Sequence, residues 1–439
     1  MILGLNYSPE LTGIGKYTGE MAAWLAARGH AVRVVTAPPY YPAWRVDAAY
    51  RSYWYRVEGG GPAGDGVVVP LVIRCPLFVP RVPTGMARIW HLASFALSAV
   101  PAMLSQVFSR PDVVLTIEPT FFCAPLALGC AALADAPAWL HVQDFEVDAA
   151  FDLGLLPAKG PVHAFAMRME RLFTRSFRKV SSISPRMVER TLLKDVPPKC
   201  AVLFPNWVDV NLIQRSAQGV RNRLRDELGL GDKVVLLYSG NMGSKQGLDL
   251  LAPLAAAFVD QPEVHFLYCG DGAYRPRLEM EAGGMANVTL LPLQPLERLN
   301  ELLNAADIHL LPQRADAADL VMPSKLTGML ASGRPMVVTA AEGTQVARVV
   351  TGSESHLARG IVVPPADLNA LVAAVKRLVA DRALRLQMGD AARSYAVEFL
   401  GRDRVLLQFE QDLAQVVREY RGIDETQAAK PEMRRAAIR

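Results

Sequence analysis

The sequence alternates apolar, strand-like runs with amphipathic helical runs, and this alternation occurs twice along the chain. Near the N-terminus the short strand ILGLN is followed by a loop with two glycines, a helix that ends at Gly29, and the strand VRVVTA. A strand, a loop, a helix and a second strand in this order form a βαβ unit with parallel strands. Further strands follow in DVVLTIEP, AWLHVQD and KVSSIS. The pattern predicts an α/β fold built on parallel sheets.

The alternation pauses near residue 208 and then starts again. The second series of strands is VVLLYSGN, VHFLYCGDG, VTLLPLQ, DIHLLPQ and PMVVTA. A chain of 439 residues is too long for one core and suits two domains of roughly 200 residues each. We therefore predict two doubly wound, Rossmann-like domains, residues 1–207 and 208–395, that face each other across a cleft and bind ligands at the carboxyl ends of their strands. Residues 396–421 are expected to form a helix that crosses back to the first domain, and the polar segment 422–439 to be a disordered tail.

Charge and cysteine content narrow the classes of function. The formal net charge of +4 is small for this length, so charge alone indicates no nucleic-acid partner. The five cysteines form no CxxC pair, which argues against a disulfide framework or a zinc knuckle and for a reducing compartment. The N-terminal sequence MILGLNYSPE has neither a basic region nor a long apolar region. We therefore expect no signal peptide and a cytoplasmic protein.

One apolar segment tests the expectation of a soluble chain. The run from Ile89 to Phe108 is about long enough to cross a bilayer. It is interrupted by His91, Pro101 and Gln106. A membrane-spanning helix, a helix that lies on a membrane surface and a buried core helix all stay open.

A second segment, FAMRMERLFTRSFRK, carries separate apolar and basic stripes at helical spacing. The apolar residues are Phe165, Met169, Phe173 and Phe177, and the basic residues are Arg168, Arg171, Arg175 and Arg178. One interpretation is a solvated helix face over a core. The other is attraction to anionic lipid headgroups.

The loop after the first strand contains Gly13, Gly15 and Lys16. Glycines there let backbone amides approach a phosphate at the N-terminus of the next helix, where the dipole also favours an anion. The loop does not match GxGxxG, and no acidic residue completes a dinucleotide fingerprint. Both interpretations, a phosphate site and a purely structural turn, stay open.

A loop of the same kind, SGNMGSKQG, follows the first strand of the second half. Small residues, amide side chains and a lysine at a helix start provide what a diphosphate needs: close backbone approach, hydrogen-bond donors and positive charge. The predicted phosphate-binding residues here are Gly240, Asn241, Gly243, Lys245, Gln246 and Gly247.

The stretch PSKLTGMLASGRP predicts a third anion site. Pro323 suits the first turn of a helix because it needs no amide partner there. Ser324 and Lys325 place a hydroxyl and a cation at the positive end of the helix dipole. A lysine in that position is repelled by the dipole unless an anion is present. Anion binding is therefore favoured over a solvated surface lysine.

The strand AWLHVQD is followed by three carboxylates at alternate positions, Asp144, Glu146 and Asp148. Because no histidine or cysteine ligands lie beside them, we expect no metal site. Asp144, preceded by Gln143, is expected at the end of the strand facing the cleft, where it contacts a sugar hydroxyl or assists proton transfer. Capping or salt bridging is the alternative for the other two carboxylates.

The segment between Pro38 and Glu58 is expected to be a loop rich in aromatic residues. Aromatic faces stack on sugar rings, and their polar tips hydrogen-bond to hydroxyls. Tyr40, Tyr41 and Trp44 are the predicted acceptor-binding residues, and simple packing of a long loop is the alternative. Interleaved arginines also suit single-stranded nucleic acid, but no nucleic-acid-binding fold accompanies them.

Several of these motifs are specific in combination. They are SGNMGSKQGL, YCGDG, the run NVTLLPLQPLERLNELLNAADIHLLP, PSK with the following ASGRPMVV, and GIVVPPADLNAL. Together they closely resemble the large retaining glycosyltransferase family of GT-B fold, often called family 4. NYSPELTGIGKYTGEMAAWLAARGH, TAPPYYPAW and HVQDFEVDA resemble one branch more closely, the colanic acid biosynthesis glycosyltransferases, thought to be fucosyltransferases. The resemblance extends from residue 2 to about residue 415.

This resemblance implies transfer of a sugar, for example fucose, from a GDP- or UDP-linked donor to a lipid-linked oligosaccharide, with retention, without a metal and at the inner face of the cytoplasmic membrane. It implies an acceptor-side first domain and a nucleotide-sugar-binding second domain. By similarity, the second-loop residues and Lys325 hold the diphosphate, and Gly13 and Gly15 close on the phosphates. Asp144 touches the reacting sugar. The remaining donor-binding residues implied are Leu293, Gln294, Asp319, Val321 and Met322.

The sequence departs from the common family pattern in two places. The second loop of the family has Arg and Lys where this chain has Asn241 and Gln246, with Lys245 one place early. The usual pair of carboxylates falls on Leu320 and Gly328, and neither is acidic. These departures keep two alternatives open: a non-catalytic paralogue that binds sugar nucleotides or scaffolds a membrane glycan assembly, and a sugar-nucleotide epimerase of the same fold.

Overall fold

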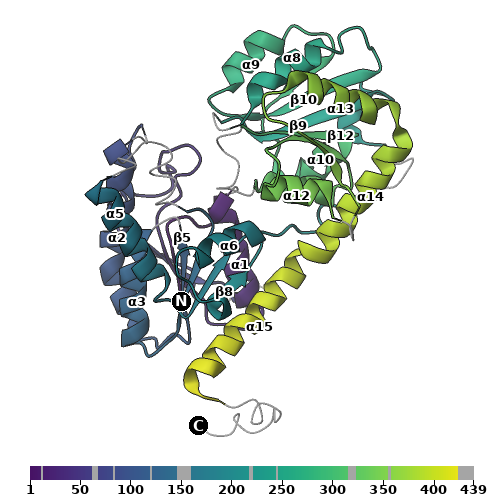
Figure 1. Ribbon diagram of the computed structural model, residues 1–439. Coiled ribbons are helices and arrows are strands. Elements are labelled where there is room, and N and C mark those ends of the chain that lie inside the picture. Colours follow the sequence, from purple (N-terminus) through teal and green to yellow (C-terminus); the bar gives the residue numbers. More distant parts are fainter. Residues whose placement is uncertain are drawn as a thin grey trace. The chain divides into compact units, whose positions relative to one another are not determined.

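The chain folds into two compact units, each built on its own mainly parallel sheet (Figure 1). The computed structural model describes residues 1–10, 13–61, 68–82, 85–118, 121–145, 160–216, 221–243, 246–314, 323–353 and 357–423. Unit 1 comprises residues 1–204 and the C-terminal part of the chain from residue 406, and unit 2 comprises residues 205–405. The prediction of two doubly wound α/β domains is confirmed. The predicted tail, 422–439, lies almost wholly outside the described residues.

Unit 1 contains a sheet whose eight described strands lie in the order β3-β4-β2-β1-β5-β6-β7-β8. Neighbouring strands are parallel except β3 and β4, which are antiparallel. The strands are β1 (Ile2–Gly4), β2 (Arg33–Thr36), β3 (Arg56–Glu58), β4 (Leu71–Arg74), β5 (Val114–Glu118), β6 (Ala138–Val142), β7 (Lys179–Ser182) and β8 (Ala201–Leu203). The helices are α1 (Gly13–Ala27), α2 (Gly85–Val107), η1 (Phe121–Cys123), α3 (Ala124–Leu133), α5 (Pro161–Thr174), α6 (Pro185–Leu192) and η2 (Pro198–Cys200).

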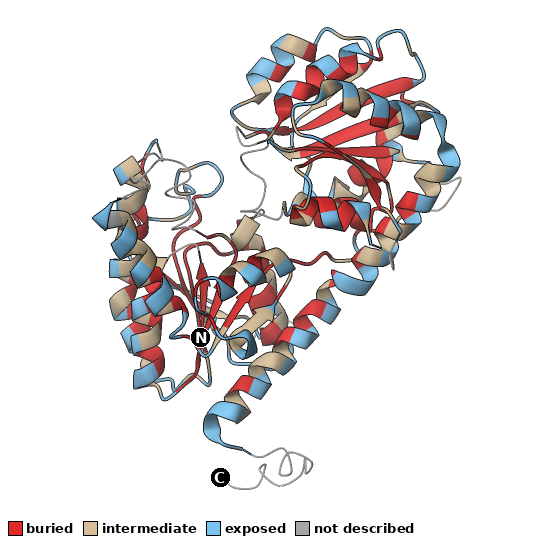
Figure 2. Cartoon of the chain, viewed as in Figure 1, coloured by how far each residue is buried: buried red, intermediate tan, exposed pale blue. Residues whose placement is uncertain are grey.

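The central strands β5 and β6 of unit 1 are buried along their whole length, and Figure 2 shows the central strands of both sheets mostly in red. A strand covered by helices on both faces needs apolar residues at consecutive positions, whereas a strand with one solvated face alternates. This requirement explains the composition of β5 and β6. Polar groups within them need internal partners. The Trp139 indole, for example, donates to Ser181 Oγ at 2.8 Å.

Unit 2 contains a sheet whose six described strands are all parallel, in the order β11-β10-β9-β12-β13-β14. The strands are β9 (Val234–Asn241), β10 (Val264–Asp271), β11 (Val288–Leu291), β12 (Ile308–Pro312), β13 (Met336–Thr339) and β14 (Gly360–Val363). The helices are α7 (Arg223–Glu227), η3 (Leu248–Leu250), α8 (Leu251–Ala256), α9 (Arg275–Ala282), η4 (Leu296–Arg298), α10 (Leu299–Ala305), α11 (Lys325–Ala331), α12 (Gln345–Thr351), α13 (Leu368–Ala380) and α14 (Arg382–Phe399).

Two hydrophobic clusters cover the two faces of the unit 2 sheet. Val235 and Leu237 of β9 belong to one cluster, and Leu236 and Tyr238 belong to the other. Successive side chains of a strand point to opposite faces, so β9 supplies both cores with fully buried residues. The central position of β9 holds its carboxyl end in a defined place.

The last helix, α15 (Arg402–Arg421), begins in unit 2 and packs on unit 1 from Leu406 onward. Phe409 is 1% exposed, and its ring stacks on Phe204 with centroids 3.9 Å apart and an interplanar angle of 7°. It also meets Trp139 edge-on at 5.2 Å. The sequence predicted one helix over residues 396–421, whereas α14 ends at Phe399 and α15 starts after Gly401.

Helix α2 is the helix among the described residues that is long and apolar enough to cross a membrane. It is also packed on unit 1, because His91, Leu92 and Phe95 are buried. Its other side is apolar and exposed at positions four or seven apart, which share one helix face. These exposed residues are Met86, Trp90, Leu97 and Leu104, and Phe108 follows directly after the helix. A purely buried core helix is therefore wrong for α2.

Two further expectations need correction. The segment 38–58 is not entirely a loop, because Arg56–Glu58 forms the edge strand β3 beside β4. The apolar stripe expected over residues 165–179 is not one helix face, because α5 ends at Thr174 and Phe177 lies beyond it. Phe165 is exposed, while the polar Glu170 is buried.

The packing of Phe409 gives a test of how α15 stabilises unit 1. Phe409→Ala removes a buried ring between two aromatic neighbours and is expected to cost about 3–5 kcal/mol. Calorimetry should show a lower melting temperature for the transition of unit 1. Leu407→Ala, on the same helix but 40% exposed, is the matched control and should change the melting temperature little. Equal shifts in both variants would contradict this packing role.

Candidate functional site

The loops singled out in the second half of the sequence meet at one edge of the unit 2 sheet. Strand β9 ends at Gly240 and Asn241, and β12, its parallel neighbour, ends at Pro312. Helix α11 is the next described element after β12, and it starts at Lys325. Because parallel strands end at the same edge, the β9 loop and the start of α11 come together.

Lys325 and Tyr238 make the central contact of this region. The Lys325 ammonium donates to the Tyr238 hydroxyl at 3.1 Å, and Nζ lies 4.2 Å from the centroid of the ring. Gly240, with φ at 119°, lies directly under the lysine stem, since a Cβ there would be 3.6 Å from Lys325 Cδ. The predicted glycine turn and the predicted lysine are thus neighbours.

No carboxylate of the described residues forms an ion pair with Lys325. Removal from water lowers the pKa of Lys325 to about 7. The cause is the cost of holding an ammonium away from solvent without an opposite charge. A polyanion placed beside the amine would restore its charged form, so this position suits a phosphate ligand.

Tyr238 connects Lys325 to the loop after β9. Its hydroxyl donates to the backbone oxygen of Asn241 at 2.7 Å and also contacts Oε1 of Gln246. Tyr238 is fully buried, and burial raises its pKa, so the hydroxyl stays protonated. The amide side chain of Gln246 is therefore held at the position where the family pattern has a lysine.

The glycines of this loop have little space for a side chain. A Cβ at Gly243 would lie 3.3 Å from Asn241 Nδ2, and one at Gly247 would lie 3.3 Å from the backbone oxygen of Gln313. Gly247 thus lets the loop pass beside the end of β12. Lys245 lies outside the described residues.

The other predicted donor contacts lie around this edge. Pro323 is partly exposed and Ser324 exposed, directly before α11, whose body is buried at Leu326, Met329 and Leu330. The segment with Leu293 and Gln294 follows β11, and Leu293 is exposed while Gln294 is partly exposed. The positions Asp319, Val321 and Met322 lie outside the described residues.

In unit 1 the first loop is organised around a buried carboxylate that the sequence reasoning missed. Glu10 is 5% exposed and accepts hydrogen bonds from Asn6 Nδ2 at 3.0 Å and from the backbone N–H groups of Tyr40 and Tyr41 at 3.1 and 3.0 Å. Burial raises the pKa of Glu10, and these hydrogen bonds oppose that rise. Glu10 therefore fastens the first loop to the aromatic segment.

Glu10 also explains one of the glycines. A Cβ at Gly15 would lie 2.4 Å from Glu10 Oε2, so only glycine leaves room for the carboxylate. Gly13 has φ at 61° and lies beside the ring of Tyr41, since its Cβ would be 3.8 Å from Tyr41 Cε1. Lys16 lies 3.8 Å from Glu20 one helical turn later. The requirement for glycine at position 15 thus has a structural explanation, the space that the Glu10 carboxylate needs.

The three predicted acceptor aromatics differ in exposure. Tyr40 is 6% exposed, and its ring meets Trp44 at 5.6 Å and His91 at 4.7 Å between centroids. Tyr40 is therefore a packing residue that does not present its ring to solvent, as the structural alternative had it. Tyr41 is 37% exposed and Trp44 partly exposed, so these two rings remain accessible.

The strand-end residues Gln143 and Asp144 lie beside a buried histidine and Tyr41. Gln143 Nε2 is 3.1 Å from His141 Nε2, and His141 Nδ1 is 2.9 Å from Ser181 Oγ. Burial lowers the pKa of His141 to about 3, so the imidazole is neutral at neutral pH. Burial raises the pKa of Tyr41, and the Asp144 carboxylate adds to this rise, which places that carboxylate near Tyr41.

Comparison with known proteins identifies the family. Residues 12–207 match the family described as Glycosyl transferase 4-like domain, and residues 233–381 match Glycosyl transferases group 1. The chain is 40% identical over 418 residues to a protein of Escherichia coli (strain K12) that carries the name colanic acid biosynthesis glycosyl transferase WcaI. That match covers 94% of this chain and 99% of the relative. The chain belongs to this glycosyltransferase family.

Solved structures of other proteins have the same fold as this glycosyltransferase. Sucrose-phosphate synthase from Thermosynechococcus elongatus has a TM-score of 0.69 at 18% identity, with 94% of this chain and 98% of that chain covered. Anabaena HepE in complex with UDP has a TM-score of 0.67 at 14% identity, with 94% and 99% covered. The GT-B fold expected from the resemblance is thereby confirmed.

The close approach of Glu10 to Gly15 predicts that adding one methyl group at Gly15 lowers the stability of this glycosyltransferase. Gly15→Ala must displace the Glu10 carboxylate and weaken its hydrogen bonds to Tyr40 and Tyr41, at a cost of about 1–3 kcal/mol. A thermal melt should show the loss. Gly129→Ala in α3, where a Cβ meets nothing within 4 Å, is the control and should be neutral or slightly stabilising. An unchanged melting temperature in Gly15→Ala would refute the steric role of Gly15.

Proposed function

We propose that this glycosyltransferase transfers a sugar from a nucleoside diphosphate sugar, and that the diphosphate binds beside Lys325 at the carboxyl edge of the unit 2 sheet. The observation that carries the proposal is the lysine amine held against the buried Tyr238, with its stem over Gly240 at the end of β9 and no carboxylate paired to it among the described residues. A protein rarely keeps an ammonium partly out of water unless an anion compensates it during function.

The chemistry of this edge fits a diphosphate more closely than a neutral sugar. Lys325 supplies a point charge, and the amide of Gln246 lies beside it through Tyr238. Hydrogen bonds from a charged donor to phosphate are short and about twice as strong as neutral ones. Gly240 lets the backbone approach, since it has no side chain between the strand end and the ligand. Positive charge from Lys325 thus takes over part of the role of the Arg and Lys of the family pattern.

We propose that the reaction retains the anomeric configuration, needs no metal and uses no cofactor beyond the donor. Gln143 and Asp144 are the proposed residues at the reacting sugar, supported by the neutral His141 that positions Gln143. Contributions from Gly13, Gly15 and Lys16 to the phosphates and from Leu293 and Gln294 to the base belong to the same proposal. The same holds for Pro323 and Ser324 and for the undescribed Lys245, Asp319, Val321 and Met322. Fucose on GDP is the first donor to test, with UDP-linked hexoses beside it.

We propose a lipid-linked oligosaccharide of exopolysaccharide biosynthesis as the acceptor. The relative from Escherichia coli is named for colanic acid biosynthesis, and this chain covers 99% of its length. Tyr41 and Trp44 are accessible rings that suit stacking on a sugar of that acceptor. Asp144 lies close enough to Tyr41 to influence its pKa, so proposed acceptor and catalytic groups share one region of unit 1.

A lipid-linked acceptor requires access to a membrane, and unit 1 has a surface that suits one. Helix α2 exposes Trp90 and Leu97 on one face, with Leu97 68% exposed. Helix α5 exposes Phe165, Arg168 and Arg171, and the exposed Arg175 follows directly after the helix. These three arginines have no ion-pair partner among the described residues. Apolar groups that enter the headgroup region and arginines that attract anionic lipids are the two parts of an interfacial site.

Figure 1 shows how these two helices reach one side of unit 1. Helices α2, α3 and α5 lie next to one another there, and α3 contacts both of the others. The proposed location is therefore the inner face of the cytoplasmic membrane, with the protein held peripherally on the surface formed by α2 and α5.

Donor binding should depend on pH through Lys325. The ammonium is the form that binds a diphosphate, so affinity is highest below pH 7 and falls as pH rises through the pKa of about 7. The limiting slope is about tenfold per pH unit, since one proton is linked to binding. Calorimetric titration with GDP-fucose and UDP-glucose, without metal, from pH 6 to 8.5 measures this effect. These donors have no phosphate group that titrates in the range.

Lys325→Met keeps the aliphatic stem and removes the amine. It should weaken donor binding by about 1–3 kcal/mol near neutral pH and make the affinity independent of pH. Lys376→Met, at an exposed position of α13, is the matched control and should bind like the native protein. Native affinity and a native pH profile in Lys325→Met would sink the proposed diphosphate site.

The surface formed by α2 and α5 predicts lipid binding in two separable parts. Trp90→Glu with Leu97→Glu should lower partition onto phosphatidylglycerol vesicles at least about tenfold, because each apolar side chain contributes about 1.5–3 kcal/mol when buried. Arg168→Gln with Arg171→Gln should reduce binding to anionic vesicles and leave binding to phosphatidylcholine unchanged. Co-sedimentation measures both effects. Leu193→Glu, at the exposed end of α6, is the control, and an equal loss there would rule out this surface.

The two alternative functions predict different products. A non-catalytic paralogue binds donor but transfers nothing to any acceptor, and an epimerase converts the free sugar nucleotide with no acceptor present. Product analysis with donor alone, and with donor plus lipid-linked oligosaccharide, separates both from the transferase.

A further inference from the structure

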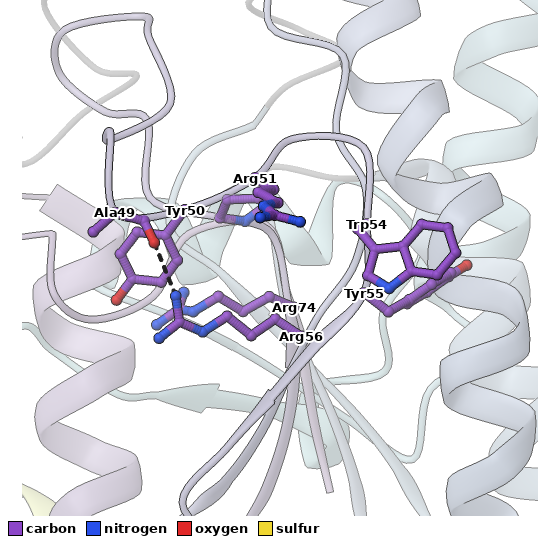
Figure 3. Close-up of a pocket in the computed structure, with 8 residues that line it drawn as sticks. Ala49, Tyr50, Arg51, Trp54, Tyr55, Arg56 and Arg74 are labelled. Atoms are coloured by element: carbon purple, nitrogen blue, oxygen red, sulfur yellow. Dashed lines mark hydrogen bonds between the residues drawn. The ribbon is translucent and has the colours of Figure 1, made fainter.

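Unit 1 contains a cavity of about 370 Å³, and none of the residues predicted to bind donor or acceptor lines it. It is formed by the segment that contains Tyr50, Arg51, Trp54 and Arg56 and by Arg74 of β4 (Figure 3). This volume is within the range of about 300–1,000 Å³ found for small-molecule sites. It suits one or two sugar rings.

The floor of the cavity is rigid and positively charged. Arg74 is 3% exposed, and it donates to Glu58 Oε2 at 3.0 Å and to the backbone oxygens of Ala37 and Ser8 at 3.1 and 2.7 Å. Arg56 pairs with the other oxygen of Glu58 at 2.9 Å. Both guanidinium groups are therefore held in place before any ligand arrives.

Tyr50 lies against both of these arginines. The Arg56 and Arg74 guanidinium carbons lie 4.9 and 4.8 Å from the centroid of its ring. Figure 3 shows both arginine side chains running toward Tyr50. The cation–π contacts fix the ring and keep the positive charge close to the cavity.

Arg51 supplies charge that nothing compensates within the described residues. It is exposed, and no hydrogen bond or ion pair of the described residues involves it. The lining residues include three arginines and no carboxylate. Glu58, behind the lining, balances one of these charges, so the cavity carries an excess of two positive charges. An anionic group is the complementary ligand.

Two aromatic residues, Trp54 and Tyr55, also line the cavity. Trp54 is 69% exposed and Tyr55 40% exposed, and the two rings lie together in Figure 3. The Tyr55 hydroxyl donates to the backbone oxygen of Ser98 in α2 at 2.7 Å, which fixes its position. Exposed aromatic rings beside fixed polar groups are typical of surfaces that stack on sugar rings.

We propose that this cavity binds an acidic sugar unit, a hexose ring that carries a carboxylate or a phosphate, with Arg51 and Arg56 on the anion and Trp54 on the ring. The inference rests on the proposed function for one point only, that this unit belongs to the glycan acceptor. A nucleic-acid strand is less suitable, because the site is a single cavity and not a groove that follows a backbone.

The link to the proposed acceptor region is structural. Arg74 donates hydrogen bonds to the backbone oxygens of Ser8 and Ala37. Ser8 lies two residues before Glu10, and Ala37 lies shortly before Tyr40 and Tyr41, whose backbone N–H groups bind Glu10. Pro38, in the same aromatic segment, lines the cavity. An acidic unit held here is therefore anchored to the backbone that carries Tyr41.

Saturation-transfer NMR on the full-length protein tests the cavity without donor. The probes are methyl glucuronide, glucose 6-phosphate, neutral methyl glucoside and glycerol 3-phosphate, which has charge but no sugar ring. We expect ring-proton signals from the two acidic sugars and much weaker signals from the other two probes. A stronger response to methyl glucuronide assigns the anion as a carboxylate, and a stronger response to glucose 6-phosphate assigns it as a phosphate.

Two exposed substitutions locate the binding. Arg51→Gln should weaken binding of the acidic sugars about tenfold or more, the effect expected for one charged hydrogen bond. Trp54→Leu should remove the ring-proton signals. Arg404→Gln, at an exposed position of α15, is the control and should bind like the native protein.

The proposal is overturned if neither acidic sugar binds, if the neutral sugar binds equally well, or if Arg51→Gln leaves the affinity unchanged. A short single-stranded oligonucleotide that displaces the acidic sugars from the native protein but not from Arg51→Gln would also overturn it. A parallel titration with UDP and GDP on the same sample reports on the donor site, so a failure of the proposed function is distinguishable from a failure of this cavity.

Discussion

Parallel pairing of β9 with β12 is the constraint on which the proposed chemistry depends. It brings Gly240, at the end of β9, to the same edge of the sheet as the start of α11. The two clusters that cover the faces of β9 hold that edge in place. Lys325 is then kept against the buried Tyr238 without a carboxylate partner among the described residues, and its pKa falls to about 7. In the proposed complex, the diphosphate supplies the opposite charge that this arrangement lacks.

Most strands of both units could be predicted from the sequence, because fully buried parallel strands are continuous apolar runs. The short strands β3, β4, β8 and β14 were not predicted. The same reasoning singled out Gly240 and Lys325, which the structure brings together at one edge of the unit 2 sheet. It missed the role of Glu10, because its partners, the backbone groups of Tyr40 and Tyr41, lie thirty positions away and leave no local pattern. Tyr40 was expected on a binding surface for the same reason, since its neighbour His91 comes from α2. Strand β3 gave no signal in the sequence, because it has only three residues, is exposed at Arg56 and Val57, and shows no alternation of apolar and polar residues.

Helix α2 shows a different limit of sequence reasoning. Its residues are apolar on both sides, so periodicity cannot tell which side is buried. Only the fold shows that His91 and Phe95 face unit 1 while Trp90 and Leu97 face outward. The buried side stabilises the unit, and the exposed side is available to lipid. One helix therefore serves both as core and as the proposed membrane contact.

The most direct test of the central claim is a crystal structure of the protein with GDP or UDP, whichever binds. The account predicts a diphosphate oxygen within hydrogen-bond distance of Lys325 Nζ, with Gly240 beneath it and the Gln246 amide beside it. A nucleotide bound elsewhere, or a diphosphate with Lys325 turned away from it, would contradict the account.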